Sequence, residues 1–99
     1  MKQLIELNYK SIVDRGLISP DTTIFNFINK LNEEVKELEV ECNYITISPI
    51  IVNPKESSSF KEELADVIMV CLNMAKHYDI DIEQEIKNKI EVNKKRALK

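Results

Sequence analysis

Residues 62–72 read EELADVIMVCL, and the rest of the predicted fold is organised around this segment. At about 100° per residue, its apolar side chains and those that follow cover most of the circumference of a helix. A helix that is apolar nearly all round is normally a buried one. Glu63 and Asp66 interrupt the apolar surface, and acidic side chains are rarely fully buried unless something pairs with them. The segment therefore predicts a buried helix carrying two acids that need a partner.

The composition predicts a small, mainly helical protein. The chain has 99 residues, of which 43% are hydrophobic and 31% charged, with one Gly and three Pro. So few helix breakers among so many Ile, Leu, Glu and Lys favour helices. This length is typical of one domain, so we expect a single domain over residues 1–99, small enough that oligomerisation would help it.

Charge and hydropathy exclude two classes of partner. The net charge of −3 gives no overall attraction to nucleic acid or to an anionic membrane, and we expect neither as a partner. The longest apolar run falls far short of the ~20 residues that span a bilayer.

The first residues, MKQLIE, lack an apolar export signal. Cys42 and Cys71 are predicted to be buried thiols in a reducing compartment, so a cytoplasmic location is expected.

Two helices are predicted in the first half of the chain. Apolar residues at helical spacing indicate a helix over residues 2–14, with Gly16 just beyond its end. A second helix is then predicted to start at Pro20, with Ser19 as its N-cap and Pro20 at its first position. One apolar stripe continues from there, giving a long helix over about residues 20–42.

Residues 43–59 have a different pattern. Tyr44 to Ser48 alternate with period two and include β-branched residues, while Pro49 and Pro54 oppose a helix. Two readings stay open: a short hairpin, or an extended arm covered by another subunit, since an isolated hairpin is marginal in water.

The second half of the chain predicts two more helices. Ser59 and Glu62 form a capping box for a helix that runs to about Tyr78. Asp81 is the expected N-cap of a last helix, to about residue 98, whose buried side consists of Ile82, Ile86, Ile90 and Ala97. His77 is expected to be a surface or helix-capping residue rather than a catalytic one.

Four acids form the strongest candidate for a functional site. Glu34 and Glu37 are three residues apart, as are Glu63 and Asp66, so each pair lies on one face of its helix. If the pairs face each other, they make an all-oxygen site suited to Mg²⁺ or Mn²⁺. Two other readings stay open: residues 33–41 as the solvated face of an amphipathic helix, and Asp66 as an acid paired with Lys or Arg.

The same motifs resemble a known family. EVKE (34–37), then 25 residues, then ELAD (63–66) is similar to the ExxE…ExxD signature of MazG-like nucleotide pyrophosphohydrolases. Four neighbouring segments resemble the family too: KLNEE (30–34), EELADV (62–67), IDIE (80–83), and the K…N..R spacing of Lys89, Asn93 and Arg96. The resemblance as a whole covers about residues 4–97. The turn before Ile80 carries Asp79 where the family usually has Gly.

The resemblance implies a fold and a metal. The fold is all-α, a four-helix MazG-like bundle with a short irregular or β-like insertion between its second and third helices. The metal is Mg²⁺, with Mn²⁺ as the alternative, held by Glu34, Glu37, Glu63 and Asp66.

The resemblance also implies a reaction, the hydrolysis of a (deoxy)nucleoside triphosphate to the monophosphate and pyrophosphate. Glu37 or Glu33 would accept the proton of the attacking water. Lys89, Asn93 and Arg96 would bind the phosphates; without the acidic motifs, a basic helix end that complements the helix dipole would be the simpler explanation of the two cations. The nucleobase is left open, because the chain has no Trp to stack on it and Val70 stands where an aromatic is common.

Two statements about partners follow. A subunit of this size is expected to complete its pocket with a neighbouring chain, in a homodimer or homotetramer. The alternative function is a non-catalytic helical module that binds a partner through the Tyr44–Val52 arm.

Overall fold

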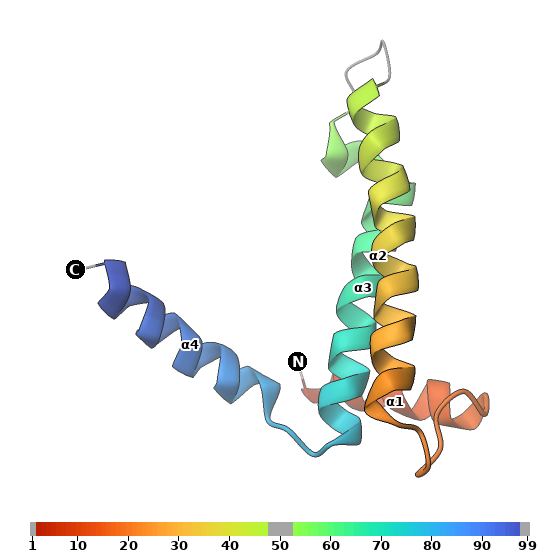
Figure 1. Ribbon diagram of the computed structural model, residues 1–99, viewed down its shortest axis with the longest axis vertical. Helices are drawn as coiled ribbons and strands as arrows, with labels where there is room; N and C mark the ends of the chain where they lie inside the picture. The colour runs from red at the N-terminus through yellow and green to blue at the C-terminus, as the bar shows by residue number, and fades with distance from the viewer. Residues whose placement is uncertain (1, 48–52, 98–99) are drawn as a thin grey trace.

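The computed structural model describes residues 2–47 and 53–97, and they form four α-helices and one short 3₁₀ helix (Figure 1). The α-helices are α1 (Lys2–Asp14), α2 (Ile24–Ile47), α3 (Ser58–His77) and α4 (Ile82–Ala97), and η1 (Pro54–Glu56) precedes α3. The described residues contain no strand, so the all-α prediction with four helices is confirmed.

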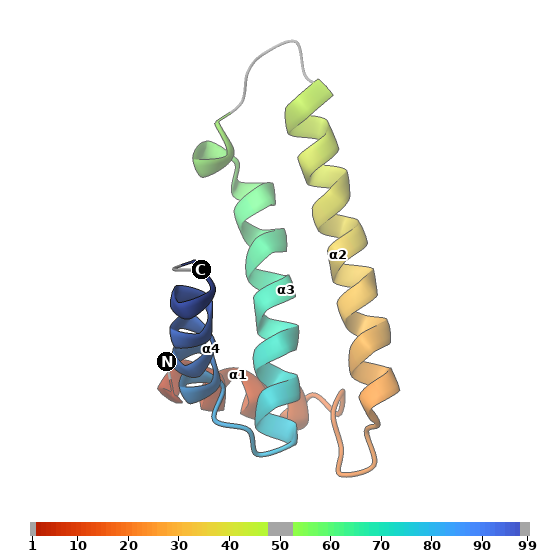
Figure 2. The same cartoon turned by 60° about the vertical axis from the view of Figure 1, so that its left-hand side comes forward.

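The long helices α2 and α3 lie side by side and antiparallel, with α1 crossing one end of the pair (Figures 1 and 2). Their contact is the most extensive in the molecule, and that between α1 and α3 is the next. The most deeply buried apolar side chains, Ile18, Phe27, Val70 and Ala75, come from α2, α3 and the loop after α1. Helix α4 projects away from the other three, and only its first turn lies near the start of α1.

The end of α1 agrees with the prediction at Gly16. This residue has φ +74°, and its N–H donates to the carbonyl of Val13 while the N–H of Leu17 donates to the carbonyl of Ile12. These two bonds define a Schellman motif, in which Gly occupies the left-handed position without a Cβ penalty.

The predicted start of α2 at Pro20 is wrong, because residues 19–22 form a turn and the helix begins at Ile24. Thr23 is the N-cap: its hydroxyl accepts from the N–H of Asn26 at 3.3 Å, and the Asn26 side chain accepts from the Thr23 N–H at 2.8 Å. The fixed φ of Pro suits a turn as well as a first helical position, so Pro20 alone did not distinguish the two.

The predicted β-like segment also needs correction, because residues 43–47 extend α2. Leu38, Glu41 and Ile45 are half-buried at helical spacing, and the Thr46 hydroxyl donates to the carbonyl of Cys42 at 2.7 Å. Packing against the rest of the molecule therefore overrides the β propensity of these residues. The remainder of the proposed hairpin or arm, residues 48–52, lies outside the described residues, and Pro54 opens η1.

The capping box predicted at Ser59 and Glu62 is wrong as well. The N-cap of α3 is Ser57, whose hydroxyl accepts from the Phe60 N–H at 3.2 Å. Ser59 therefore lies inside the helix, and Glu62 is an exposed residue of its second turn. Three consecutive serines offered three possible caps, and the preceding η1 turn selects the first of them.

Helix α3 is less buried than its sequence predicts. Val70, Asn73 and Ala75 are buried, whereas Leu64 and Ile68 are 40% and 50% exposed. The reason is that α4 does not cover α3. The thiols of Cys42 and Cys71 are exposed and free, so the prediction that they are buried is wrong.

Helix α4 begins as predicted, since the Asp81 carboxylate accepts from the Gln84 N–H at 3.1 Å. Its predicted apolar side is only partly covered: Ile82 is half-buried, while Ile86 and Ile90 are 47% and 46% exposed. None of the described helices is both long enough and apolar enough to cross a membrane.

The end of α3 repeats the Schellman motif of α1 with Asp79 in the position of the glycine. Asp79 has φ +54°, the Ile80 N–H donates to the Ala75 carbonyl at 2.9 Å, and the Asp79 N–H donates to that of Lys76 at 3.1 Å. A residue with a Cβ is strained in this conformation, although Asp tolerates it better than most.

We expect Asp79→Gly to raise the free energy of unfolding by about 0.5–1 kcal/mol, because it relieves this strain. Gly16→Ala is the matched control. A Cβ at Gly16 would meet nothing within 4 Å, so only backbone strain should lower its stability, by about 1 kcal/mol. Urea unfolding of the three proteins measures both effects, and a loss of stability in Asp79→Gly would contradict this account.

Candidate functional site

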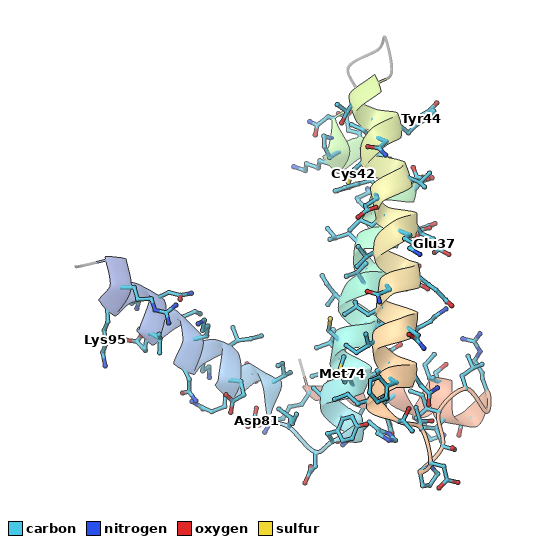
Figure 3. All side chains as sticks on the ribbon, viewed as in Figure 1. Glu37, Cys42, Tyr44, Met74, Asp81 and Lys95 are labelled. Atoms are coloured by element: carbon cyan, nitrogen blue, oxygen red, sulfur yellow. The ribbon has the colours of Figure 1, made fainter. Side chains whose placement is uncertain are left out.

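Three of the four predicted metal ligands come together where α2 and α3 face each other. Glu34 and Glu37 on α2 and Glu63 on α3 each offer a carboxylate oxygen, and these oxygens all lie within 4.8 Å of one another. Glu34 is buried, Glu63 half-buried and Glu37 exposed. Figure 3 shows Glu37 about halfway along α2. We call these three residues the acidic cluster.

Asp66, the fourth predicted ligand, lies one turn further along α3. It is half-buried and lines a cavity together with Glu33 and Glu34, outside the close group of three. Its charge still acts on the cluster, because it is one of the carboxylates that raise the pKa of Glu63.

Two carboxylate oxygens of the cluster are buried without a hydrogen-bond partner among the described residues, Glu34 Oε2 and Glu63 Oε2. The other oxygen of Glu34 pairs with the ammonium of Lys30 at 3.1 Å, and Lys30 also lies 3.7 Å from Glu33. Buried carboxylate oxygens are normally paired or bound to a metal. An all-oxygen donor set with net negative charge fits a hard cation such as Mg²⁺ or Mn²⁺.

The electrostatics of Glu63 point the same way. Burial is the largest cause that raises the pKa of Glu63 above its usual value, followed by hydrogen bonding to Glu37 and by the charges of Glu37, Asp66 and Glu34. The pKa of Lys30 is also raised, chiefly by its hydrogen bond to Glu34. The site thus favours positive charge and opposes the full ionisation of its acids.

A cavity of about 510 Å³ adjoins the cluster between α1, α2, α3 and the loop after α1. This size is within the range of sites for small organic ligands. Its apolar lining consists of Ile12, Leu17, Ile18, Phe27, Met69 and Val70. Its polar lining consists of Arg15, Thr22, Asn26, Asn29, Lys30, Glu33, Glu34, Asp66 and Asn73.

Three hydrogen bonds hold the wall of this cavity. Asn73 is buried, and its amide oxygen accepts from the side chain of Asn8 on α1 at 2.7 Å. His77 joins three segments: its Nε2 lies 3.1 Å from the Thr22 carbonyl and its Nδ1 lies 2.8 Å from the Tyr9 hydroxyl. Because a carbonyl only accepts, Nε2 carries a hydrogen, and in the neutral imidazole the Tyr9 hydroxyl therefore donates to Nδ1. His77 is thus half-buried and structural, and it is not a surface residue.

Sequence reasoning missed the amides and Lys30 as parts of this site. Asn73 follows Asp66 by seven residues and Asn26 precedes Glu33 by seven, so each lies on the same helix face as a predicted acid. That spacing was a usable signal. The pairing of Asn73 with Asn8, 65 residues away, had no local signal.

The predicted phosphate-binding residues do not reach the cluster within one chain. Lys89, Asn93 and Arg96 are exposed on α4, which points away from α2 and α3 (Figure 1). Figure 3 shows their neighbour Lys95 far from Glu37.

The profile of the MazG-like family matches residues 33–98, two-thirds of the chain, which includes all four acids and α4. The chain therefore belongs to the MazG-like family. A comparison with curated proteins gave no match, and neither did a comparison with solved structures. The family points to the superfamily of nucleotide pyrophosphohydrolases, in which metal dependence is typical.

We expect Glu63→Gln to stabilise the metal-free protein at pH 7. The pKa of Glu63 is raised by folding, so its neutral form favours the folded state below the unfolded pKa, near 4.5, and this benefit is lost as pH rises through the folded pKa. Gln mimics the neutral form at every pH. The difference from wild type should therefore shrink as pH falls from 7 towards 4.5.

Urea unfolding with a chelator present, repeated across this pH range, measures the difference. Glu62→Gln is the matched control, because Glu62 is exposed and adjacent in sequence, and its effect should stay within about 0.5 kcal/mol. A Glu63→Gln effect that does not vary with pH would show that the charge of Glu63 is not the cause.

Proposed function

We propose that this protein catalyses the Mg²⁺-dependent hydrolysis of a (deoxy)nucleoside triphosphate to the monophosphate and pyrophosphate. One observation carries the proposal: two buried carboxylate oxygens that have no hydrogen-bond partner among residues 2–47 and 53–97 lie on helices that face each other, beside a cavity large enough for a nucleoside. Membership of the MazG-like family supports the reaction class.

Glu34, Glu37 and Glu63 would hold the metal, with Asp66 one turn away as a fourth oxygen donor. When bound, Mg²⁺, or Mn²⁺ in its place, supplies positive charge for the phosphate oxygens and lowers the pKa of coordinated water.

The acids that remain partly solvated are suited to proton transfer. Glu33 and Glu37 are both exposed, and Glu33 lines the cavity, so either carboxylate can accept the proton of the attacking water. The water oxygen forms a bond to phosphorus, the bond from phosphorus to the bridging oxygen breaks, and pyrophosphate leaves with the bonding electron pair.

The nucleoside would occupy the cavity. Phe27 and Met69 offer apolar contact, and the amides of Asn26, Asn29 and Asn73 offer hydrogen bonds to a base or a sugar. The amide oxygens of Asn26 and Asn73 already accept hydrogen bonds from Thr23 and Asn8, so the NH₂ groups of these two residues are the donors that remain for a base or a sugar.

A second copy of the chain would supply the remaining cations, in a homodimer or homotetramer. Ile82, Ile86 and Ile90 form one stripe of α4 and are flanked by Lys89 and Arg96. Within one chain, α4 packs on little else. On α3, Leu64 and Ile68 remain exposed. Among the described residues, Lys30 is the one cation that pairs with the acidic cluster. Both the apolar surfaces and the charges are complementary between copies.

A pyrophosphate-release assay over a panel of nucleoside triphosphates with Mg²⁺ tests the function. We expect turnover of at least one substrate, and a loss of about 100-fold or more in kcat/KM for Glu34→Gln or Glu63→Gln, since each removes a charged metal ligand. Glu39→Gln is the matched control: Glu39 is exposed on α2 and outside the cluster, so its activity should stay within about twofold.

Calorimetry with Mg²⁺ gives a second readout, in which the same two variants should bind the ion more weakly than Glu39→Gln does. If wild type turns over no substrate and binds neither Mg²⁺ nor Mn²⁺, the non-catalytic alternative, a helical module for partner binding, replaces this proposal.

Subunit mixing tests whether α4 acts between copies. Glu63→Gln and the double variant Lys89→Ala/Arg96→Ala should each be weakly active alone. If a site combines the acids of one copy with α4 of another, the two variants unfolded and refolded together at equal amounts should recover about a quarter of wild-type activity, because one random pairing in four joins intact parts.

No recovery above the mean of the two separate variants would place α4 and the acids of one site in the same chain. Refolded wild type gives the reference for recovery. Lys95→Ala is the matched control for removal of a cation, because Lys95 lies on the opposite face of α4.

A further inference from the structure

Lys30 is the cation closest to the acidic cluster, and the proposed reaction gives it no role. It lies one turn before Glu34 on α2, with its ammonium 3.1 Å from Glu34 Oε1 and 3.7 Å from Glu33 Oε2. These are the only ion pairs that the acids of the site make within the described part of the chain. Lys30 also lines the cavity, so it lies at the boundary between the cluster and the space for a nucleotide.

The two oxygens of Glu34 have different surroundings. Oε1 is paired with Lys30, whereas Oε2 is buried and has no hydrogen-bond partner in the described part of the chain. Lys30 thus compensates one side of this carboxylate and leaves the other side available.

The two partners differ in their freedom to move. The side chain of Glu34 is 10% exposed and is held between α2 and α3, whereas that of Lys30 is 58% exposed. A lysine has a flexible four-carbon stem and a compact charge that can change partners without a fixed geometry. When a competing charge enters the site, Lys30 is therefore the partner that moves.

A divalent cation among Glu34, Glu37 and Glu63 would compete with Lys30 in two ways. It would take over the charge of Glu34 that Lys30 now compensates, and it would repel the ammonium across a few ångströms. A triphosphate in the adjoining cavity would then offer Lys30 new oxygens close to its present position.

We propose that Lys30 is an exchangeable counter-ion, which pairs with Glu33 and Glu34 in the metal-free protein and transfers to the substrate phosphate once the metal is bound. This inference rests on the proposed function, because it assumes that a metal and a phosphate chain meet at this site. It gives Lys30 a role in the order of binding: Lys30 would leave Glu34 once a divalent cation compensated that carboxylate, and it would then favour the binding of the nucleotide.

The exchange predicts that Lys30→Gln changes the affinities for Mg²⁺ and for triphosphate in opposite directions. Lys30→Gln removes a cation that competes with the metal, so Mg²⁺ should bind more tightly in the absence of nucleotide. The same change removes a phosphate contact, so the triphosphate should bind more weakly. A purely structural i, i+4 pair on α2 predicts weaker binding of both ligands, since its loss would loosen the helix, so the change in Mg²⁺ affinity distinguishes the two explanations.

Calorimetry measures both arms on the whole chain. With Mg²⁺ alone, we expect the Kd of Lys30→Gln to fall by about threefold to tenfold. With inorganic triphosphate added to the Mg²⁺-saturated protein, we expect its Kd to rise by about tenfold. Inorganic triphosphate is used because it carries the phosphate chain and needs no knowledge of the base. Lys30→Arg should restore the binding of triphosphate, since it restores the charge.

Lys36→Gln is the matched control, with the same substitution six residues along α2, about 120° round the helix from Lys30, at a residue that does not line the cavity. It should leave both Kd values unchanged. Circular dichroism and urea unfolding establish that each variant is folded.

The outcomes separate this inference from the proposed function. Wild type that releases pyrophosphate and binds Mg²⁺, with Lys30→Gln showing unchanged or weaker Mg²⁺ binding, overturns the inference and leaves the function standing. Tighter Mg²⁺ binding with unchanged binding of triphosphate overturns the transfer to phosphate. Wild type that binds no divalent ion overturns both.

Discussion

The contact between α2 and α3 imposes the constraint on which the rest of the structure depends, because it holds like charges together in a partly buried place. Glu34 is buried, one of its oxygens has no partner among the residues that the structure describes, and Glu37 and Glu63 lie close enough to repel it. Two carboxylates about 4 Å apart repel by about 1 kcal/mol in water and by about 4 kcal/mol at an effective dielectric constant near 20. Apolar contacts elsewhere along the two helices must offset this repulsion in the metal-free protein.

Those apolar contacts are few for a chain of this length, and this explains why the surface is so apolar. Phe27 and Val70 are buried near the contact, whereas large apolar side chains on α3 and α4 remain accessible. A chain that spreads its helices this widely buries less of its apolar surface than a compact bundle does. Cover from another copy would supply the missing burial, and the same contact would bring cations to a site rich in acids.

The sequence predicted the helices better than their ends. The apolar periodicity of 3.6 residues extends over many positions, so no single residue can mislead it. A helix end depends on one cap, and alternatives to that cap were present at Ser19 and among residues 57–59. The structure uses Thr23 as the cap of α2, with Asn26 in the role usually taken by Glu or Gln. It uses Ser57, next to η1, as the cap of α3. The β-like pattern of residues 43–47 failed because helical packing of Ile45 outweighed local preference.

The acids were recognisable because their three-residue spacing is a local property that a helix converts directly into a shared face. The cavity was not, since it is built by contacts between residues far apart in the sequence, such as Asn8 with Asn73 and Tyr9 with His77.

This difference separates two functions of the structure. The acidic cluster depends on the register of α2 against α3 alone, whereas the cavity also depends on α1 and its loop, which His77 fastens through the Thr22 carbonyl. The loop can therefore change the shape of the cavity without moving the carboxylates. Under the proposed function, α1 and its loop would shape the space around the nucleoside, while the side chains that contact it and the carboxylates of the reaction would both come from α2 and α3.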